Sequence, residues 1–439
     1  MTMLKLMATV GLLALATPGI AAEPDYAAAI RADYDKDLGA LFDWFHRHPE
    51  LSFKETNTAA RMARELRAAG ATVTEGVGGT GVVAILKNGA GPTVLVRADM
   101  DGLPLKEASG LPNMSIARQV GIDGIEQPVM HACGHDTHIT ALVATARRLA
   151  AMKDRWKGTV VMIVQPAEER VGGAAAMLKD GLYTRFPKPD YALAFHVDSG
   201  MATGTIAGAE GISSSSADSV DITVPGIGAH GAAPDAGKDP VYMASQIVIA
   251  LQGLISREKA PLTPGVITVG SFHSGTKHNI ISDEAKLQIT VRANDEKTRA
   301  ALLAGIKRVA EGVGRLNGMP EDKLPKVVVS EGTPTTINDV ALAKRMNAAL
   351  TRDLGTGVVV PFEQVGMGAE DFAYFIQPEL KVPGYYFLVG GTAKAALDAA
   401  ERGGPAVPSH HSPLFRIDPK PAVVMGATAM TAAVLEVLK

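Results

Sequence analysis

The stretch TVVMIVQPAEE (residues 159–169) decides the fold of this chain, because it joins an apolar strand directly to two carboxylates. The run up to Val164 is continuously apolar and β-branched, which is typical of a strand buried on both faces of a sheet. Similar runs and intervening helical segments follow the same plan: strands at 82–86, 93–96 and 191–195, helices at 137–152 and 173–180. This alternation predicts an α/β domain with a mostly parallel sheet and helices on both faces.

The chain changes character after about residue 207. The segment 219–224 alternates polar and apolar residues, which predicts a half-exposed strand of an antiparallel sheet. Further elements of this kind are predicted as strands at 265–272 and 285–292 and helices at 241–257 and 296–315. We therefore predict an α+β domain at 213–323, inserted into an α/β domain that is formed by 23–212 and 324–439.

Composition excludes several classes of protein. The chain has 439 residues, 46% hydrophobic and 20% charged, which excludes a disordered protein and allows two or three domains. The net charge of −3 and the lack of a basic run argue against nucleic acid or an anionic membrane as a partner. The single cysteine, Cys133, excludes an intramolecular disulfide.

Residues 1–22 resemble a secretory signal peptide. Lys5 precedes an apolar run at 6–16, and small residues lead to Ala22. This pattern predicts export with cleavage near Ala22. The alternative interpretation is an uncleaved interfacial or membrane anchor. No later stretch has the ~18 consecutive apolar residues of a membrane span, so we expect a periplasmic protein with no stable membrane association.

Chemically active residues follow the predicted strands. In an open α/β sheet, ligands bind beyond the carboxyl ends of the strands. The segment RADMD (97–101) follows one strand, His196 ends another, and HACGHDTH (131–138) leads into a helix. With Glu168 and Glu169, these segments bring Asp, Glu, His and Cys side chains to one edge of the sheet.

The residue types at this edge indicate a metal site. Cys133 and His135 are two positions apart, so an extended segment directs both side chains the same way. Thiolate, imidazole and carboxylate ligands suit Zn²⁺, and Mn²⁺, Co²⁺ or Ni²⁺ also fit. Of the adjacent carboxylates, one can bind metal while the other takes a proton from a metal-bound water. The alternatives are a Cys133 that is merely a small buried residue and a Glu168–Glu169 pair exposed in a loop.

Four motifs together resemble the amidohydrolase branch of the binuclear metallopeptidases: RADMDGLP (97–104), HACGHD (131–136), QPAEE (165–169) and HSP (411–413). That branch holds hippurate hydrolases, auxin–amino acid conjugate hydrolases and aminoacylases, and its wider family includes carboxypeptidase G-type enzymes and dipeptidases. The resemblance implies cleavage of the amide bond of an N-acyl amino acid by a metal-activated water. The alternatives are a dipeptidase or carboxypeptidase, and a non-catalytic exported peptide-binding protein.

The resemblance also implies roles for individual residues. Two divalent metal ions, Zn²⁺ or Mn²⁺ with Ni²⁺ and Co²⁺ as alternatives, would share the ligands Cys133, His135, Glu169, His196 and His411. Glu168 would be the general base. Asp99 and Asp101 would orient the ligands, and Asp101 is also predicted to take part in catalysis. Asp136 is interpreted equally well as a helix cap, and His138 as a residue on the face of a helix. His410 is not expected to bind metal.

The inserted domain carries a second part of the resemblance. GAHGAAP (228–234) resembles a glycine-rich motif whose histidine, here His230, is supplied by the neighbouring subunit of a homodimer and stabilises the oxyanion. This implies a lid and dimerisation domain. Asn279 and Arg292 match positions that hold the carboxylate of the substrate, although Ser282 stands where the family usually has proline. GMGAEDF (366–372) resembles a loop near the site, and Glu370 receives no definite role.

Overall fold

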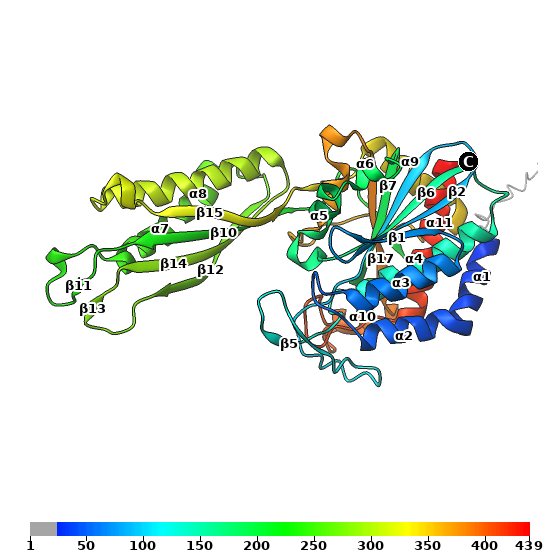
Figure 1. Ribbon diagram of the computed structural model, residues 1–439, viewed down its shortest axis with the longest axis horizontal. Helices are drawn as coiled ribbons and strands as arrows, with labels where there is room; N and C mark the ends of the chain where they lie inside the picture. The colour runs from blue at the N-terminus through cyan, green and yellow to red at the C-terminus, as the bar shows by residue number, and fades with distance from the viewer. Residues whose placement is uncertain (1–23) are drawn as a thin grey trace, which may run out of the picture.

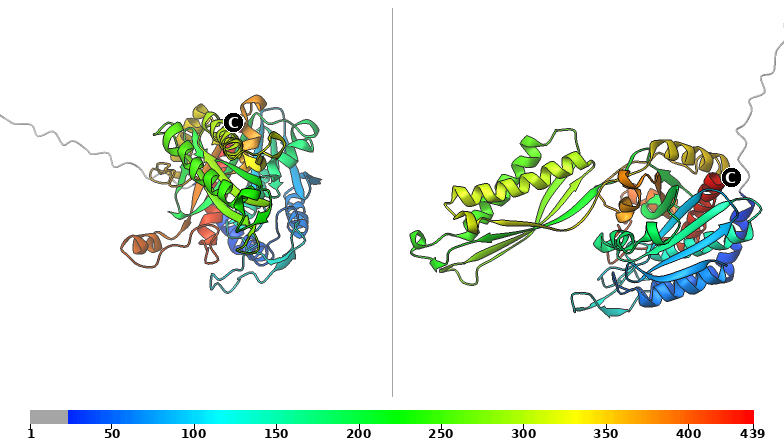
Figure 2. Two further views of the ribbon diagram at one scale, coloured as in Figure 1. Left: turned by 90° about the vertical axis from the view of Figure 1, so that its left-hand side faces the viewer. Right: turned by 45° about the horizontal axis from the view of Figure 1, so that its top comes forward.

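The computed structural model describes residues 24–439 and has two parts. A large α/β domain carries an elongated α+β domain that projects from one side (Figure 1). Two further views show the same separation, with the strands of the projecting part running along its length (Figure 2). The signal peptide predicted for residues 1–22 lies outside the described residues.

The large domain is built on a seven-stranded sheet with the order β1-β2-β6-β3-β7-β17-β8. The strands β6, β3, β7 and β17 run parallel, and antiparallel strands complete both edges. The bounds are β1 Thr72–Val77, β2 Gly81–Asn88, β3 Thr93–Asp99, β6 Gly158–Gln165, β7 Tyr191–Ala202, β8 Ile206–Gly208 and β17 Gly384–Thr392. The predicted α/β class is confirmed, and the parallel strands form the buried centre.

Helices cover both faces of this sheet because its strands are apolar on both sides. Val82 and Val94 face one core with the helices α3, α4, α9 and α11, whereas Val83 and Leu95 face the other core with α5. The bounds are α1 Asp25–Asp33, α2 Gly39–Arg47, α3 Thr56–Ala68, α4 His135–Ala151, α5 Gly173–Lys179, α6 Leu182–Arg185, α9 Val340–Leu354, α10 Lys394–Glu401 and α11 Pro419–Leu438.

Helix α11 is long and apolar enough to cross a membrane, but 83% of its most apolar window is buried inside the protein. It packs against α4, α9 and the sheet. Its composition therefore follows from its position as a core helix, which is apolar all round.

The projecting domain contains a four-stranded antiparallel sheet with the order β12-β14-β10-β15. Helices α7 and α8 cover one face of it, and every second residue of β14 up to Ile289 is exposed. The bounds are β10 Ser216–Pro225, α7 Pro240–Gly253, β12 Gly265–Ser274, β14 Glu284–Ala293, α8 Glu296–Leu316 and β15 Lys326–Thr333.

The structure corrects one predicted boundary. The inserted domain was expected to end at 323, but β15 pairs with β10 over Lys326–Thr333, so its sheet continues to Thr333. As an edge strand, β15 is largely exposed and lacks a clear apolar alternation. Only its pairing assigns it to this sheet.

Candidate metal centre

The predicted site residues meet beyond the carboxyl ends of neighbouring strands. Asp99 ends β3. His196 was predicted to end its strand, but it lies within β7, which continues to Ala202. β6 ends at Gln165, and a short 3₁₀ helix at Glu168–Arg170 follows. Cys133 lies just before α4, which begins at His135. Because β6, β3 and β7 are neighbours in the sheet, their ends converge on one edge.

The five residues implied as ligands lie close together. Cys133 Sγ is 3.4 Å from His196 Nε2, and His411 Nε2 is 3.3 Å from Glu169 Oε2. His135 Nε2 is 3.9 Å from Glu169 Oε1. Two groups of potential ligand atoms, each within 4.8 Å, share the cysteine: Cys133, His135 and His196, and Cys133, Glu169 and His411. The structure therefore brings all five ligands into overlapping clusters.

The chemistry of this donor set fits divalent cations. His135 Nε2 and Glu169 Oε1 are buried and have no hydrogen-bond partner within residues 24–439. Burial raises the pKa of Glu169 to about 8, and burial with the nearby Glu169 and Glu168 carboxylates raises the pKa of the Cys133 thiol well above its usual range. Buried unpaired acceptors of this kind are costly unless a cation binds them.

Asp101 holds the two glutamates in place. Its Oδ1 atom accepts the backbone N–H of Glu168 at 3.1 Å, and its Oδ2 atom accepts that of Glu169 at 3.1 Å. The Ser52 hydroxyl donates to the same carboxylate at 2.6 Å. The backbone oxygen of Asp101 accepts from His135 Nδ1 at 2.8 Å, which leaves His135 Nε2 for the cluster. Through these hydrogen bonds, Asp101 orients the site residues.

His138 is part of the support of the site. Its Nδ1 atom lies 2.5 Å from Asp99 Oδ1, and its Nε2 atom accepts the backbone N–H of Val197 at 2.9 Å. Both ring nitrogens make hydrogen bonds, so His138 connects α4 to β7, the strand that carries His196. Asp136 accepts the N–H of Thr137 and pairs with His46, so it connects the first turn of α4 to α2. The helix cap that the sequence allowed for Asp136 is not formed, because the N-cap residue is Gly134.

The interpretation of the sequence missed a buried charge network beneath the cluster. Arg97 is fully enclosed, with Nη1 2.5 Å from Asp99 Oδ2 and Nη2 2.5 Å from Glu370 Oε1. Asp371 Oδ1 lies 3.3 Å from Nη2, and the Tyr386 hydroxyl donates to Glu370 at 2.8 Å. An arginine inside an otherwise apolar strand is a signal for such a network, because buried arginines are paired.

A cleft of about 650 Å³ opens above the cluster. It is lined by Cys133, Glu168 and His196 from the α/β domain and by Arg292 of β14. Arg292 Nε donates to the Thr290 hydroxyl at 3.2 Å and makes no ion pair in the described part of the chain. Arg292 therefore lines the cleft with a guanidinium that is not engaged in an ion pair within the described residues.

His410 also lines this cleft, although the sequence suggested a bystander. Its Nε2 atom accepts the backbone N–H of Ser199 at 3.2 Å, and its ring packs edge-on against His196 with centroids 5.3 Å apart. His410 therefore forms a wall beside His196.

His230 and Asn279 lie away from the cluster. The short strands β11 (Ala229–His230) and β13 (Ile280–Ile281) pair at the end of the projecting domain farthest from the α/β domain (Figure 1). The backbone N–H of Gly231 donates to the backbone oxygen of Asn279 at 2.8 Å, so the segments that carry His230 and Asn279 are neighbours. Within one chain they do not reach the cleft.

Comparisons with known proteins agree with this site. Residues 95–402 match the model of peptidase family M20/M25/M40. The chain is 37% identical over 344 residues to a hippurate hydrolase of Campylobacter jejuni, covering 78% of this chain and 85% of that protein. It is 36% identical over 388 residues to thermostable carboxypeptidase 1 of Saccharolobus solfataricus, covering 86% and 91%.

A solved structure resembles most of the chain. The YXEP protein of Bacillus subtilis, described as a dinuclear metal binding peptidase of the M20 family, has a TM-score of 0.72 and 28% identity, covering 94% of this chain and 99% of that one. The chain belongs to peptidase family M20/M25/M40 and is a metal-dependent hydrolase of linear amide bonds.

Proposed function

We propose that this protein is an exported amidohydrolase that cleaves the amide bond of N-acyl amino acids. The observation that carries the proposal is the shared cleft of about 650 Å³, which Glu168, Arg292 and every residue of the ligand cluster except His135 line. A guanidinium without an ion pair can hold a carboxylate, which would anchor the amino-acid end of the substrate. The amide carbonyl would then lie near the cluster.

The residues of this chain suit acid–base catalysis at that position. Two divalent cations held by Cys133, His135, Glu169, His196 and His411 would supply Lewis acidity and lower the pKa of a bound water toward ~7. Glu168 accepts a proton from the attacking water as its oxygen bonds to the carbonyl carbon. Glu168 then returns that proton to the amide nitrogen as the C–N bond breaks, giving a carboxylic acid and an amino acid.

The surroundings of Glu168 favour this role. Its Oε2 atom is 3.9 Å from His135 Nε2, and its backbone is held by Asp101. Burial, with the Glu370 and Glu169 carboxylates, raises the pKa of Glu168 well above its usual range. A raised pKa makes the Glu168 carboxylate a stronger acceptor for the proton of the attacking water.

We assign the oxyanion donor to His230 of a second subunit in a homodimer. His230 is exposed, and its Nδ1 atom accepts the backbone N–H of Ala232 at 3.0 Å. In the neutral ring the proton is then on Nε2, which makes that nitrogen a donor. One such donor is typically worth about 10²–10³ in rate. Asn279 would come into the same cleft with it.

The role of Glu168 is tested with Glu168→Gln. We expect hydrolysis of N-acetyl and N-benzoyl amino acids to fall by about 10²–10⁴-fold while elemental analysis finds an unchanged content of Zn²⁺ or Mn²⁺. Glu331→Gln, on the exposed rim of the same cleft, is the matched control. Near-normal hydrolysis by Glu168→Gln would remove the assigned base.

The substrate class is tested with a panel of N-acyl amino acids and free-amine dipeptides. A dipeptidase or carboxypeptidase is the second candidate, because the chain resembles a thermostable carboxypeptidase. We expect the N-acyl amino acids to have the higher kcat/KM. Preferential cleavage of dipeptides would favour the second candidate. Binding of the panel without cleavage would favour a non-catalytic exported peptide-binding protein.

Export to the periplasm is also part of the proposal and rests on residues 1–22. Cell fractionation followed by N-terminal sequencing tests it. We expect a periplasmic protein that begins near Glu23. A cytoplasmic protein that retains residues 1–22 would contradict this.

A further inference from the structure

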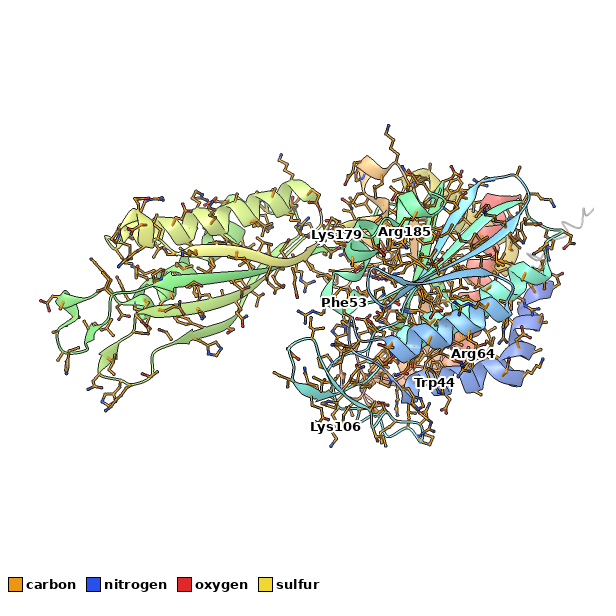
Figure 3. The ribbon with its side chains drawn as sticks, viewed as in Figure 1. Trp44, Phe53, Arg64, Lys106, Lys179 and Arg185 are labelled. Atoms are coloured by element: carbon orange, nitrogen blue, oxygen red, sulfur yellow. The ribbon has the colours of Figure 1, made fainter. Side chains whose placement is uncertain are left out.

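A second cavity, of about 330 Å³, lies in the α/β domain and shares no lining residue with the 650 Å³ cleft. Its walls come from α2, from the loop after β3 and from the segment after α10. In Figure 3, Trp44 on α2 and Lys106 on that loop mark the lower edge of this domain. The lining includes exposed residues such as Arg416, so the cavity communicates with solvent.

His131 gives the cavity an unsatisfied polar group. It is 2% exposed, and both of its ring nitrogens lack a hydrogen-bond partner in the described chain. A neutral imidazole offers one donor and one acceptor. Leaving a buried donor or acceptor unpaired costs about 1–3 kcal/mol, so a polar atom of a ligand is stabilised next to this ring.

Among the charged side chains that line the cavity, one cation has no ion-pair partner in the described residues. Arg47 pairs with Asp43 at 2.9 Å, and His46 pairs with Asp136 at 2.7 Å. Arg416 makes no hydrogen bond or ion pair within residues 24–439. The cavity therefore has an uncompensated guanidinium, which favours an anionic ligand.

The remaining walls are apolar. Phe42, Leu111, Pro112, Phe415 and Ile417 supply them. The volume is at the lower end of the ~300–1,000 Å³ found for ligand sites. We propose that this cavity binds a small carboxylate with a compact apolar body, whose charge is met by Arg416 and one of whose oxygens accepts from His131.

A neighbouring cavity of about 470 Å³ shares Leu111, Arg416 and Ile417 with this one, so a test must separate the two. Asn113 lines only the first cavity and Ala399 only the second. Asn113→Trp therefore fills the proposed site, and Ala399→Trp is its matched control.

The experiment titrates benzoate into the metal-loaded protein and follows binding by ligand-observed NMR. We expect Arg416→Gln to weaken binding about threefold to fivefold, because the guanidinium is exposed. We expect Asn113→Trp to abolish it. Ala399→Trp and Arg402→Gln, an exposed arginine outside both cavities, should bind as the unmodified protein does. Benzyl alcohol, which lacks the charge, should bind more weakly.

Several results overturn the proposal. Loss of binding in Arg292→Gln alone would place benzoate only in the 650 Å³ cleft, and loss in Ala399→Trp alone would place it in the neighbouring cavity. Equal binding of benzyl alcohol would contradict the preference for a carboxylate. An absence of saturable binding would show that the cavity does not bind this ligand. Hydrolysis is tested separately, with Glu168→Gln.

Discussion

Arg97 and Glu370 are 273 positions apart in the sequence, yet Arg97 Nη2 lies 2.5 Å from Glu370 Oε1. The same guanidinium also holds Asp99 and Asp371. Since Asp99 positions His138 and Glu370 lines the cleft, this one buried cation connects the sheet to the floor of the site.

Replacing Arg97 with methionine should destabilise the protein strongly. It removes the cation and leaves Asp99, Glu370 and Asp371 buried together, and breaking a buried ion pair costs about 3–5 kcal/mol. Urea unfolding measures the loss in the free energy of unfolding. Arg118→Gln, which breaks an exposed pair with Glu126, should cost about 0–1 kcal/mol. Equal losses in both variants would contradict the structural role of the network.

Replacing Asp101 with asparagine should lower kcat more than it changes KM. Asparagine retains one acceptor for the N–H groups of Glu168 and Glu169 but presents an amide N–H₂ to the other, which misaligns the base. Changes to groups that support ligands typically cost about 10–100-fold. Ser52→Ala, which removes one donor to Asp101, should have a smaller effect. An unchanged kcat in Asp101→Asn would show that the base does not need this anchor.

Mixing two inactive variants tests the origin of His230. In a heterodimer of Glu168→Gln and His230→Ala chains, one site receives an intact Glu168 and an intact histidine from different chains. We therefore expect an equal mixture to recover about a quarter of the unmodified activity. If His230 acted in its own chain, every site would remain defective, and no activity would return after subunit exchange.

The stability contributed by His46 should depend on pH. Burial lowers its pKa, but hydrogen bonds to Asp136 and Glu107 outweigh this and raise it from 6.5 to about 10. A raised folded-state pKa gives stability that is complete below pH 6.5 and is lost as the pH rises through 10. The difference in the free energy of unfolding between the unmodified protein and His46→Gln should be about 3–5 kcal/mol at pH 6 and shrink toward pH 10.

The control for this measurement is His48→Gln, on the exposed end of the same helix segment. Its difference from the unmodified protein should stay small at every pH. A difference for His46→Gln that does not change between pH 6 and pH 10 would contradict the charge on His46.

Removing the metal should expose Cys133 to chemical modification. Cys133 is the only cysteine, so a maleimide reports on this site alone. A coordinated thiolate is protected, and metal binding is coupled to folding of the site. We expect slow labelling of the metal-loaded protein, at least about tenfold faster labelling after dialysis against a chelator, and protection again when Zn²⁺ is restored. Identical labelling rates would exclude Cys133 as a ligand.

The sequence alone predicted the α/β class and the group of residues at one edge of the sheet. Both follow from local patterns: continuously apolar strands must be buried on both faces, and the residues after parallel strands meet at one edge. Cys133, His135, Glu169 and His196 lie in the segments at that edge, whereas the full ligand set, with His411, came from the resemblance to a known family.

Only the tertiary structure decided the rest. The edge strand β15 joins the inserted sheet by backbone pairing, which leaves little trace in the pattern of side chains. The Arg97–Glu370 pair, the wall formed by His410 and the distance of His230 from its own cleft depend on contacts between distant segments. Local periodicity carries information about neighbours along one element, whereas these contacts are set by how whole elements pack.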